Sequence, residues 1–275
     1  MKILRKAAEV PQLRDGVVGL VPTMGAFHEG HLNLMLAARA ECDTVFVSLF
    51  VNPTQFGPNE DYGNYPRDED RDFELAYTVG ADYVFAPSVE EMFPRKTTTV
   101  HVEGVTELWE GAHRPGHFDG VATVVCKLFN IVRPDVAYFG QKDYQQCAVV
   151  RTMVADLNLP ARLRFCDTMR EDNGLAMSSR NRYLGPDERE KAASLYRELS
   201  ALASKLRADA APDRGAVASA LAGTVGELSS LGFSVDYLAL VDPETLAPID
   251  RLNGEARLIA AARLGKVRLI DNVAV

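Results

Sequence analysis

The sequence predicts an α/β fold, a doubly wound parallel sheet, followed by a second, smaller α+β domain. Through the first 165 residues, short apolar runs alternate with amphipathic segments of helix length. Such nearly continuous apolar runs fit strands that are buried on both faces of a parallel sheet. After Arg180 the pattern changes to two helical segments and then three short strands. With 275 residues, the chain has the length of one large domain or two ordinary ones.

Five strands are expected in the first domain, with helices between them. The strands are expected at residues 17–21, 45–51, 83–86, 136–139 and 162–166. The helices are expected at residues 31–41, 67–79, 121–132 and 144–157. Repeated strand, helix, strand order gives right-handed crossovers, and ligands of such sheets bind at the carboxyl ends of the strands.

The smaller domain is expected to begin with a long charged helix. Pro186 and the acids that follow it mark the start of this helix, which continues to about residue 208. A second, alanine-rich helix is expected at residues 214–231. Three short strands are expected at residues 235–241, 256–260 and 267–270. The predicted domains are therefore residues 1–175 and 176–275.

Composition and charge exclude several classes of protein. The chain is 47% hydrophobic and 25% charged, which is ordinary for a globular protein and argues against disorder. Its 38 acidic and 30 basic residues give a net charge of −8, so no basic surplus attracts nucleic acid or an anionic membrane. The longest apolar stretches, such as residues 44–51, are far shorter than the roughly 18 residues that span a bilayer. Four isolated cysteines and no signal-peptide pattern favour the cytoplasm.

The first candidate site is the segment Pro-Thr-Met-Gly-Ala-Phe-His-Glu-Gly-His at residues 22–31, between an expected strand and an expected helix. His28 and His31 are three residues apart and would face the same way on a helix. A helix start offers N–H groups and a positive dipole to an anion, and Gly25 and Gly30 let a phosphate approach the backbone. A phosphate contact is therefore favoured, with a metal site and structural capping as alternatives.

The second candidate site is the segment Phe-Gly-Gln-Lys-Asp-Tyr-Gln-Gln at residues 139–146, where a strand again ends and a helix begins. Lys142 supplies a point charge for a phosphate. Asp143 could cap the helix, hold a ribose hydroxyl or hold a metal-bound water. Taken alone, the segment could equally be a surface turn with a solvated lysine.

The third candidate site is Met-Ser-Ser-Arg-Asn at residues 177–181. Two hydroxyls and a guanidinium suit the polyphosphate of a nucleotide, because a guanidinium pairs with two phosphate oxygens at once. The alternative is a polar linker between the two domains.

The fourth candidate site follows the strand at residues 45–51. The uncharged amides of Asn52 and Gln55 could hydrogen-bond a neutral or hydroxylated organic substrate. An Asn-Pro turn explains Asn52 equally well. The acids at residues 68–72 could hold Mg²⁺, although they are more often an acidic first turn of a helix.

Together these motifs resemble the pantoate–β-alanine ligase family, the pantothenate synthetases. The matching phrases are P-T-M-G-A-x-H-E-G-H at 22–31, V-N-P-T-Q-F at 51–56, Y-P-R at 65–67, R-P-G-H-F-D-G-V at 114–121, F-G-x-K-D-Y-Q-Q at 139–146 and S-S-R-N at 178–181. The segments at 241–245 and 269–272 are similar as well. A lone H-x-G-H marks only a broad class of nucleotidyl-transferring enzymes, whereas six phrases in series are highly specific.

The resemblance implies a Rossmann-like first domain, a smaller C-terminal domain that closes over ATP, and a homodimer. It also implies a ligation in two steps that requires Mg²⁺. Pantoate attacks the α-phosphorus of ATP to give pantoyl adenylate and pyrophosphate, and the amine of β-alanine then displaces AMP. The expected partners are therefore the small molecules pantoate, β-alanine and ATP, with no nucleic acid and no membrane.

The resemblance also implies roles for individual residues in ATP binding. The positions that match the family's ATP contacts are Met24, Gly25, His28, His31, Gly140, Gln141, Lys142, Asp143, Met169, Met177, Ser178, Ser179 and Arg180. Among these, the catalytic positions are His28, His31, Lys142 and Arg180, with His31 at the position of the proton donor. Gln141 stands where the family commonly has Glu, which leaves the role of that position open.

The resemblance places the organic substrates and the metal on a second set of residues. Gln55 and Gln146 match the family's pantoate-binding glutamines, with Gln55 also directed towards β-alanine, and Asn52 and Tyr65 complete that pocket. Asp72 is the expected Mg²⁺ ligand. Two alternatives are an H-x-G-H transferase that uses no amine and a nucleotide-binding module without catalysis. The glutamine pair argues against the first, and the intact set of cationic residues against the second.

Overall fold

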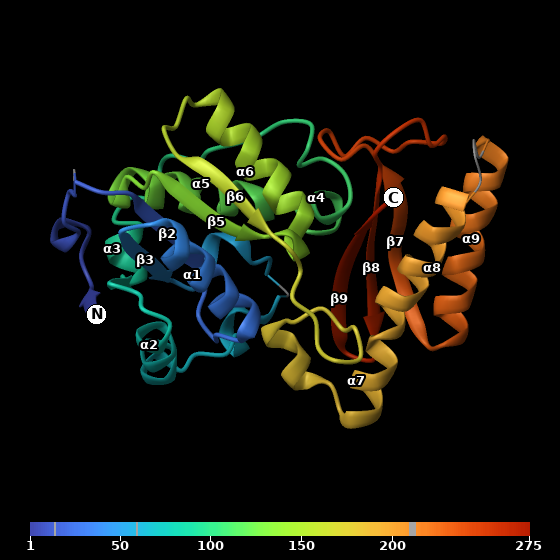
Figure 1. Ribbon diagram of the computed structural model, residues 1–275, viewed down its shortest axis with the longest axis horizontal. Helices are drawn as coiled ribbons and strands as arrows, with labels where there is room; N and C mark the ends of the chain where they lie inside the picture. The colour runs from blue at the N-terminus through green and yellow to red at the C-terminus, as the bar shows by residue number, and fades with distance from the viewer. Residues whose placement is uncertain (14, 59, 209–212) are drawn as a thin grey trace. The chain divides into compact units, whose positions relative to one another are not determined.

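The computed structural model describes residues 1–13, 15–58, 60–208 and 213–275, which form two compact units (Figure 1). Unit 1 comprises Met1–Gln141 and Gln145–Asp167. Unit 2 comprises Lys142–Tyr144 and Thr168–Val275. The short segment Lys142–Tyr144 therefore belongs with unit 2, although it lies within the sequence of the first predicted domain.

Unit 1 contains a six-stranded sheet in the order β1-β4-β3-β2-β5-β6, and all of its neighbouring strands are parallel. The strands are β1 (Lys2–Leu4), β2 (Val18–Thr23), β3 (Thr44–Leu49), β4 (Tyr83–Phe85), β5 (Val136–Gly140) and β6 (Arg162–Cys166). The predicted doubly wound parallel sheet is confirmed. The edge strand β1 was not predicted.

Helices cover both faces of this sheet. They are α1 (Glu29–Glu41), α2 (Glu69–Thr78), α3 (Val89–Met92), α4 (Glu110–His113), α5 (His117–Val132) and α6 (Tyr144–Asp156), the last beginning in unit 2. Strand residues alternate between two cores: Phe46 packs with the apolar residues of α5 and α6, whereas Val45 and Val47 pack with those of α1 and α2. This alternation explains why the central strands read as continuous apolar runs.

Unit 2 is an antiparallel sheet covered by helices. Its strands β7 (Phe233–Val241), β8 (Arg257–Leu264) and β9 (Val267–Ala274) pair in that order. The helices α8 (Ser194–Ala208) and α9 (Arg214–Ser230) pack beside each other, and contact β9 and β7 respectively (Figure 1). The helix predicted from residue 186 to 208 is divided, because α7 (Pro186–Ala192) ends just before α8 begins. The smaller α+β domain is otherwise confirmed. Within the described ranges, no helix is both long and apolar enough to cross a bilayer.

Candidate active site

The loop between β2 and α1 brings the two predicted histidines together. Helix α1 begins after His28, whose Nδ1 accepts a hydrogen bond from Gly30 N at 3.2 Å. His31 Nδ1 accepts from His28 N at 3.4 Å, and the centroids of the two rings lie 4.1 Å apart. Since both Nδ1 atoms act as acceptors, neutral rings carry their proton on Nε2. Two Nε2–H groups on one helix start are suited to anionic oxygens.

Asp72 contacts the backbone of this loop. Its carboxylate accepts hydrogen bonds from Ala26 N and Phe27 N, both at 2.7 Å. The residue is 1% exposed, and burial raises the pKa of its carboxyl group against the opposite effect of the two N–H donors. A Mg²⁺ ion usually keeps several waters, so it needs an accessible ligand oxygen. The geometry of Asp72 does not fit that requirement, and the described residues contain no group of three or more His, Cys, Asp or Glu side chains arranged for a metal.

Gln55 and Asn52 meet after the end of β3. Gln55 ends the short helix η2 (Pro53–Gln55), and Asn52 caps it by accepting from Thr54 N at 3.2 Å. The Asn52 amide donates to Gln55 Oε1 at 3.1 Å and to Gly120 O at 3.0 Å. Gln55 Nε2 in turn contacts the sulfur of Met24 at 3.0 Å. Because Asn52 is 1% exposed, it acts as a support that fixes the Gln55 side chain.

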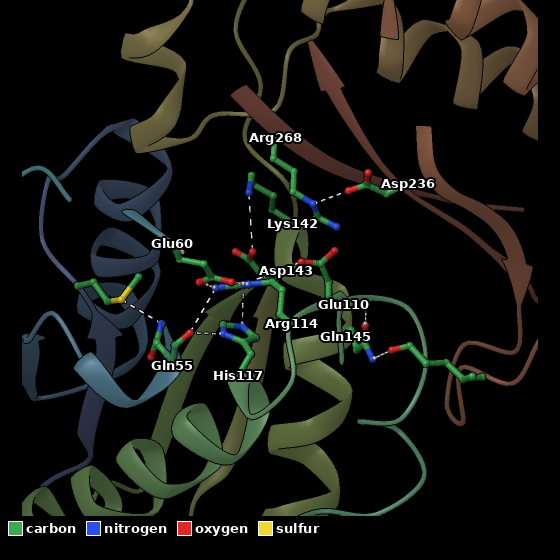
Figure 2. Close-up of polar contacts among 12 residues, drawn as sticks. Gln55, Glu60, Glu110, Arg114, His117, Lys142, Asp143, Gln145, Asp236 and Arg268 are labelled. Atoms are coloured by element: carbon green, nitrogen blue, oxygen red, sulfur yellow. Dashed lines mark hydrogen bonds and ion pairs between the residues drawn. The ribbon is translucent and has the colours of Figure 1, made fainter. Parts of the chain in front are cut away.

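The backbone of Gln55 is held by a partly buried cluster of Arg114, His117 and Glu60 that sequence reasoning missed (Figure 2). His117 Nδ1 lies 2.8 Å and Arg114 Nη2 3.3 Å from Gln55 O. Arg114 also forms two hydrogen bonds of 2.7 Å with the Glu60 carboxylate. The R-P-G-H phrase contains both Arg114 and His117, but neither received a role because the partners Gln55 and Glu60 lie more than 50 residues away in the sequence.

The partners of His117 determine its protonation. A carbonyl can only accept, so Nδ1 donates to Gln55 O, and Arg114 Nη1 donates to Nε2 at 3.1 Å. Both ring nitrogens are therefore satisfied in the neutral form. Burial, with the nearby Arg114 charge, lowers the pKa of His117 to about 4.

This lowered pKa predicts a pH dependence of stability. Unfolded His117 takes up a proton as the pH falls below 6.5, while the folded residue stays neutral down to about pH 4. The free energy of unfolding should therefore fall by about 2 kcal/mol between pH 7 and pH 5. Urea unfolding of wild type and of His117→Asn measures this, and the variant should lose less stability over the same range. The exposed His101, whose pKa Asp119 raises, supplies the control His101→Asn. Equal pH slopes for wild type and His117→Asn would contradict the assignment.

Gln146 and Gln145 are neighbours on α6 with different surroundings. Gln145 is buried, accepts from Glu110 N at 2.9 Å and donates to Val105 O and Leu108 O at 2.8 Å each. The Gln145 side-chain amide is therefore hydrogen-bonded to backbone groups of the protein itself. Gln146, the residue predicted to bind substrate, is partly exposed.

Tyr65 was also predicted to line the substrate pocket. It is buried, and its ring makes an edge contact with the ring of Phe56.

Unit 2 holds the predicted phosphate contact at Lys142. The Lys142 carbonyl accepts from Asn272 Nδ2 at 3.1 Å, and Lys142 Nζ lies 3.7 Å from Asp143 Oδ1. The next residue, Tyr144, donates to Pro243 O at 2.8 Å and lies under the Arg257 guanidinium, 4.0 Å from the ring centroid. The segment is thus held by β9 through Asn272, by β8 through Arg257 and by Pro243, which follows β7. The adjacent residues Gly140 and Gln141 belong to unit 1.

The remaining predicted ATP residues lie on one segment of unit 2. Met177 N donates to Met169 O at 2.9 Å, which joins the two methionines. Ser178 caps the short helix η5 (Ser179–Tyr183) by accepting from Arg180 N at 3.3 Å. The structure therefore brings together Met169, Met177, Ser178, Ser179 and Arg180. It likewise brings together Met24, Gly25, His28 and His31 in unit 1.

The arrangement has clear counterparts among known proteins. The sequence matches the family Pantoate-beta-alanine ligase over residues 1–274. The chain belongs to the pantoate-beta-alanine ligase family. The predicted resemblance is thereby confirmed over almost the whole chain.

Individual relatives of the pantoate-beta-alanine ligase family agree with this. A pantothenate synthetase from Rhizorhabdus wittichii is 54% identical over 272 residues, which cover 97% of this chain and 94% of that protein. The crystal structure of pantothenate synthetase from Thermus thermophilus has a TM-score of 0.93 at 50% identity and 99% coverage of both chains. A pantoate-beta-alanine ligase from Francisella tularensis, complexed with beta-gamma ATP and beta-alanine, has a TM-score of 0.83 at 34% identity, covering 99% of this chain and 97% of that one.

Proposed function

We propose that this protein joins pantoate to β-alanine at the expense of ATP, forming pantothenate, AMP and pyrophosphate. The match to the ligase family over residues 1–274 carries the proposal. The Francisella tularensis relative, complexed with an ATP compound and β-alanine, supports the choice of substrates. The reaction passes through pantoyl adenylate: a pantoate carboxylate oxygen bonds to the α-phosphorus as pyrophosphate leaves. The amine of β-alanine then attacks the acyl carbon, and AMP leaves.

The first step makes modest demands on acid–base chemistry. A carboxylate is already ionised at neutral pH, so it needs no strong base to become a nucleophile. The step instead needs donors that stabilise charge on the transferring phosphoryl oxygens. In our proposal His28 and His31 supply Nε2–H donors from the start of α1. In unit 2, Lys142 and Arg180 supply positive charge to ATP phosphates, and Ser178 and Ser179 supply hydroxyls.

The adenylate step can be tested separately from the ligation. Labelled pyrophosphate should be incorporated into ATP in the presence of pantoate and in the absence of β-alanine. Formation of pantothenate without any such exchange would contradict a reversible adenylate.

Gln55 and Gln146 are proposed to bind pantoate, with Tyr65 beside them. Pantoate carries hydroxyls and a carboxylate, and uncharged amides can hydrogen-bond both kinds of group. The Gln55 amide is pre-oriented because Asn52 and Met24 contact its two ends. The uncharged glutamine pair favours a small hydroxy acid as the substrate. It is less suited to the phosphate-bearing acceptor of the alternative function, an H-x-G-H transferase that uses no amine.

Gln55→Ala should weaken pantoate binding much more than ATP binding. Loss of a hydrogen bond to a buried substrate costs about 1 to 3 kcal/mol, which corresponds to about a 5- to 150-fold rise in the KM for pantoate. Steady-state kinetics with each substrate varied in turn measures both constants. Gln12→Ala, at a glutamine whose side chain donates to the backbone carbonyls of Val10 and Ile131, is the matched control. An equal rise in both KM values would reject the assignment of Gln55 to pantoate.

Mg²⁺, the homodimer, the closure over ATP and the cytoplasmic location stay predictions. Asp72 does not fit the proposed metal, as its carboxylate is buried against the loop backbone. Mg²⁺ commonly binds enzymes together with substrate phosphates, where it neutralises their charge. We therefore keep the Mg²⁺ requirement as a property of the ATP complex, without a ligand from this chain.

A further inference from the structure

We propose that Asp72 is a positioning residue of the ligase: its carboxylate fixes the loop that leads into His28 and His31, and it does not bind a metal ion. The proposal rests on the proposed function for the role of the two histidines. The contacts by which Asp72 fixes the loop lie within unit 1 and do not depend on the proposed function. Asp72 lies in the first turn of α2, whereas the loop joins β2 to α1 about 45 residues earlier.

The contacts of Asp72 are directed at the loop backbone. Oδ2 accepts from Ala26 N at 2.7 Å, and Oδ1 accepts from Phe27 N at 2.7 Å. Two successive backbone N–H groups thus share one carboxylate, an arrangement in which the backbone forms a small anion-binding concavity. All three residues are buried, so removing the carboxylate would take the acceptor away from two buried N–H groups, which is costly.

The loop has a conformation that needs such support. Gly25 has φ = +81° and Ala26 has φ = +52°, and the latter is unfavourable for a residue with a side chain. A Cβ atom at Gly25 would lie 2.9 Å from Asp72 Oδ2, so the carboxylate approaches the backbone where only glycine leaves room. Directly after this strained stretch, His28 caps α1. The position of both imidazoles therefore depends on how the backbone at residues 25–27 is held.

The neighbouring acids have other partners or lie in solvent. Asp68 caps α2 by accepting from Arg71 N at 3.3 Å, and Glu69 pairs with Arg5 at 2.7 Å. Asp70 is exposed. In the described part of the acidic segment, Asp72 alone is buried against the loop, which makes Asp70 a matched control that differs in burial.

The test compares Asp72→Asn with Asp70→Asn in the full-length protein. An asparagine retains one acceptor oxygen but places an NH₂ group against one of the two N–H donors. We expect Asp72→Asn to slow pantoate-dependent pyrophosphate exchange by about 10-fold to 100-fold at saturating substrates. The concentration of Mg²⁺ that gives half-maximal exchange should change less than twofold. Asp70→Asn should match wild type in both measurements.

A double-mutant cycle with His31→Ala separates positioning from general destabilisation. If Asp72 acts through the histidines, Asp72→Asn should add less than a threefold loss once His31 is already alanine. Fully additive losses would overturn the proposal in favour of a general structural role. A 10-fold or larger shift in the Mg²⁺ requirement would overturn it in favour of a metal ligand. An unchanged exchange rate in Asp72→Asn would also overturn it.

Hydrogen exchange of the wild-type protein provides a readout that needs no variant and no activity. The amides of Ala26 and Phe27 should exchange slowly without Mg²⁺, and adding Mg²⁺ alone should not change their rates. Fast exchange of these amides, or protection that appears only with Mg²⁺, would overturn the proposal even if Asp72→Asn fails to fold. If wild type shows no pantoate-dependent exchange of pyrophosphate, the proposed function fails, whereas the slow amide exchange still decides whether Asp72 holds the loop.

Discussion

His31→Ala should slow formation of pantoyl adenylate by about 100-fold or more while leaving the fold intact, which is the scale for loss of one preorganised donor. One structural feature explains the expected loss of rate, and a second explains why the fold should remain intact. His31 accepts from His28 N through Nδ1, which leaves Nε2–H of the neutral ring as the donor. The side chain is partly exposed on the first turn of α1, so its removal leaves no large cavity.

Single-turnover release of pyrophosphate, with pantoate present and enzyme in excess over ATP, measures the step directly. His113→Ala, which replaces an exposed histidine in α4, should behave like wild type and serves as the control. A single-turnover rate for His31→Ala within threefold of wild type would remove His31 from the mechanism.

Lys142→Met should produce a similarly large loss, about 100- to 1000-fold in kcat/KM for ATP, because one charged donor to the triphosphate disappears. Methionine has a similar length but no charge. The segment itself should remain in place, since Asn272 binds the Lys142 carbonyl and Tyr144 is held by Pro243 O and Arg257. The defect should therefore appear in ATP kinetics and not in thermal stability.

Lys191→Met offers a control of the same chemistry in unit 2, because Lys191 is an exposed residue of α7. Its kcat/KM for ATP should equal that of wild type. If Lys142→Met lowers kcat/KM for pantoate but not for ATP, Lys142 contacts the acid and not the triphosphate, and the assignment is wrong.

Much of the fold could be predicted because its strands carry a strong local signal. The central strands β2, β3 and β5 are buried on both faces, and continuous apolar runs report this burial directly. The edge strand β1 has only three residues, with two of them exposed, so no apolar run marked it. The break between α7 and α8 was missed because the residues around Ala193 are helix formers, and tertiary packing decides where the two helices separate.

The candidate site could likewise be predicted only in part from the sequence. Segments in which a strand ends near a glycine and a helix begins can be identified locally, and this pattern singled out His28, His31 and Lys142 as candidates. The supports of these segments come from distant parts of the chain. Periodicity and spacing contain no information on the contact of Asp72 with Ala26 or on the buried contact of His117 with the Gln55 carbonyl. For this reason the sequence offered Asp72 as one of several acids in a first helical turn, and the structure distinguishes it from them.

Product analysis tests the central claim most directly. The purified protein is incubated with ATP and Mg²⁺, with pantoate, β-alanine, both or neither, and AMP, ADP, pyrophosphate and pantothenate are followed. We predict AMP, pyrophosphate and pantothenate in equal amounts, with pantothenate formed only when both organic substrates are present. Formation of ADP, or release of pyrophosphate without any need for pantoate, would contradict the proposed ligase activity.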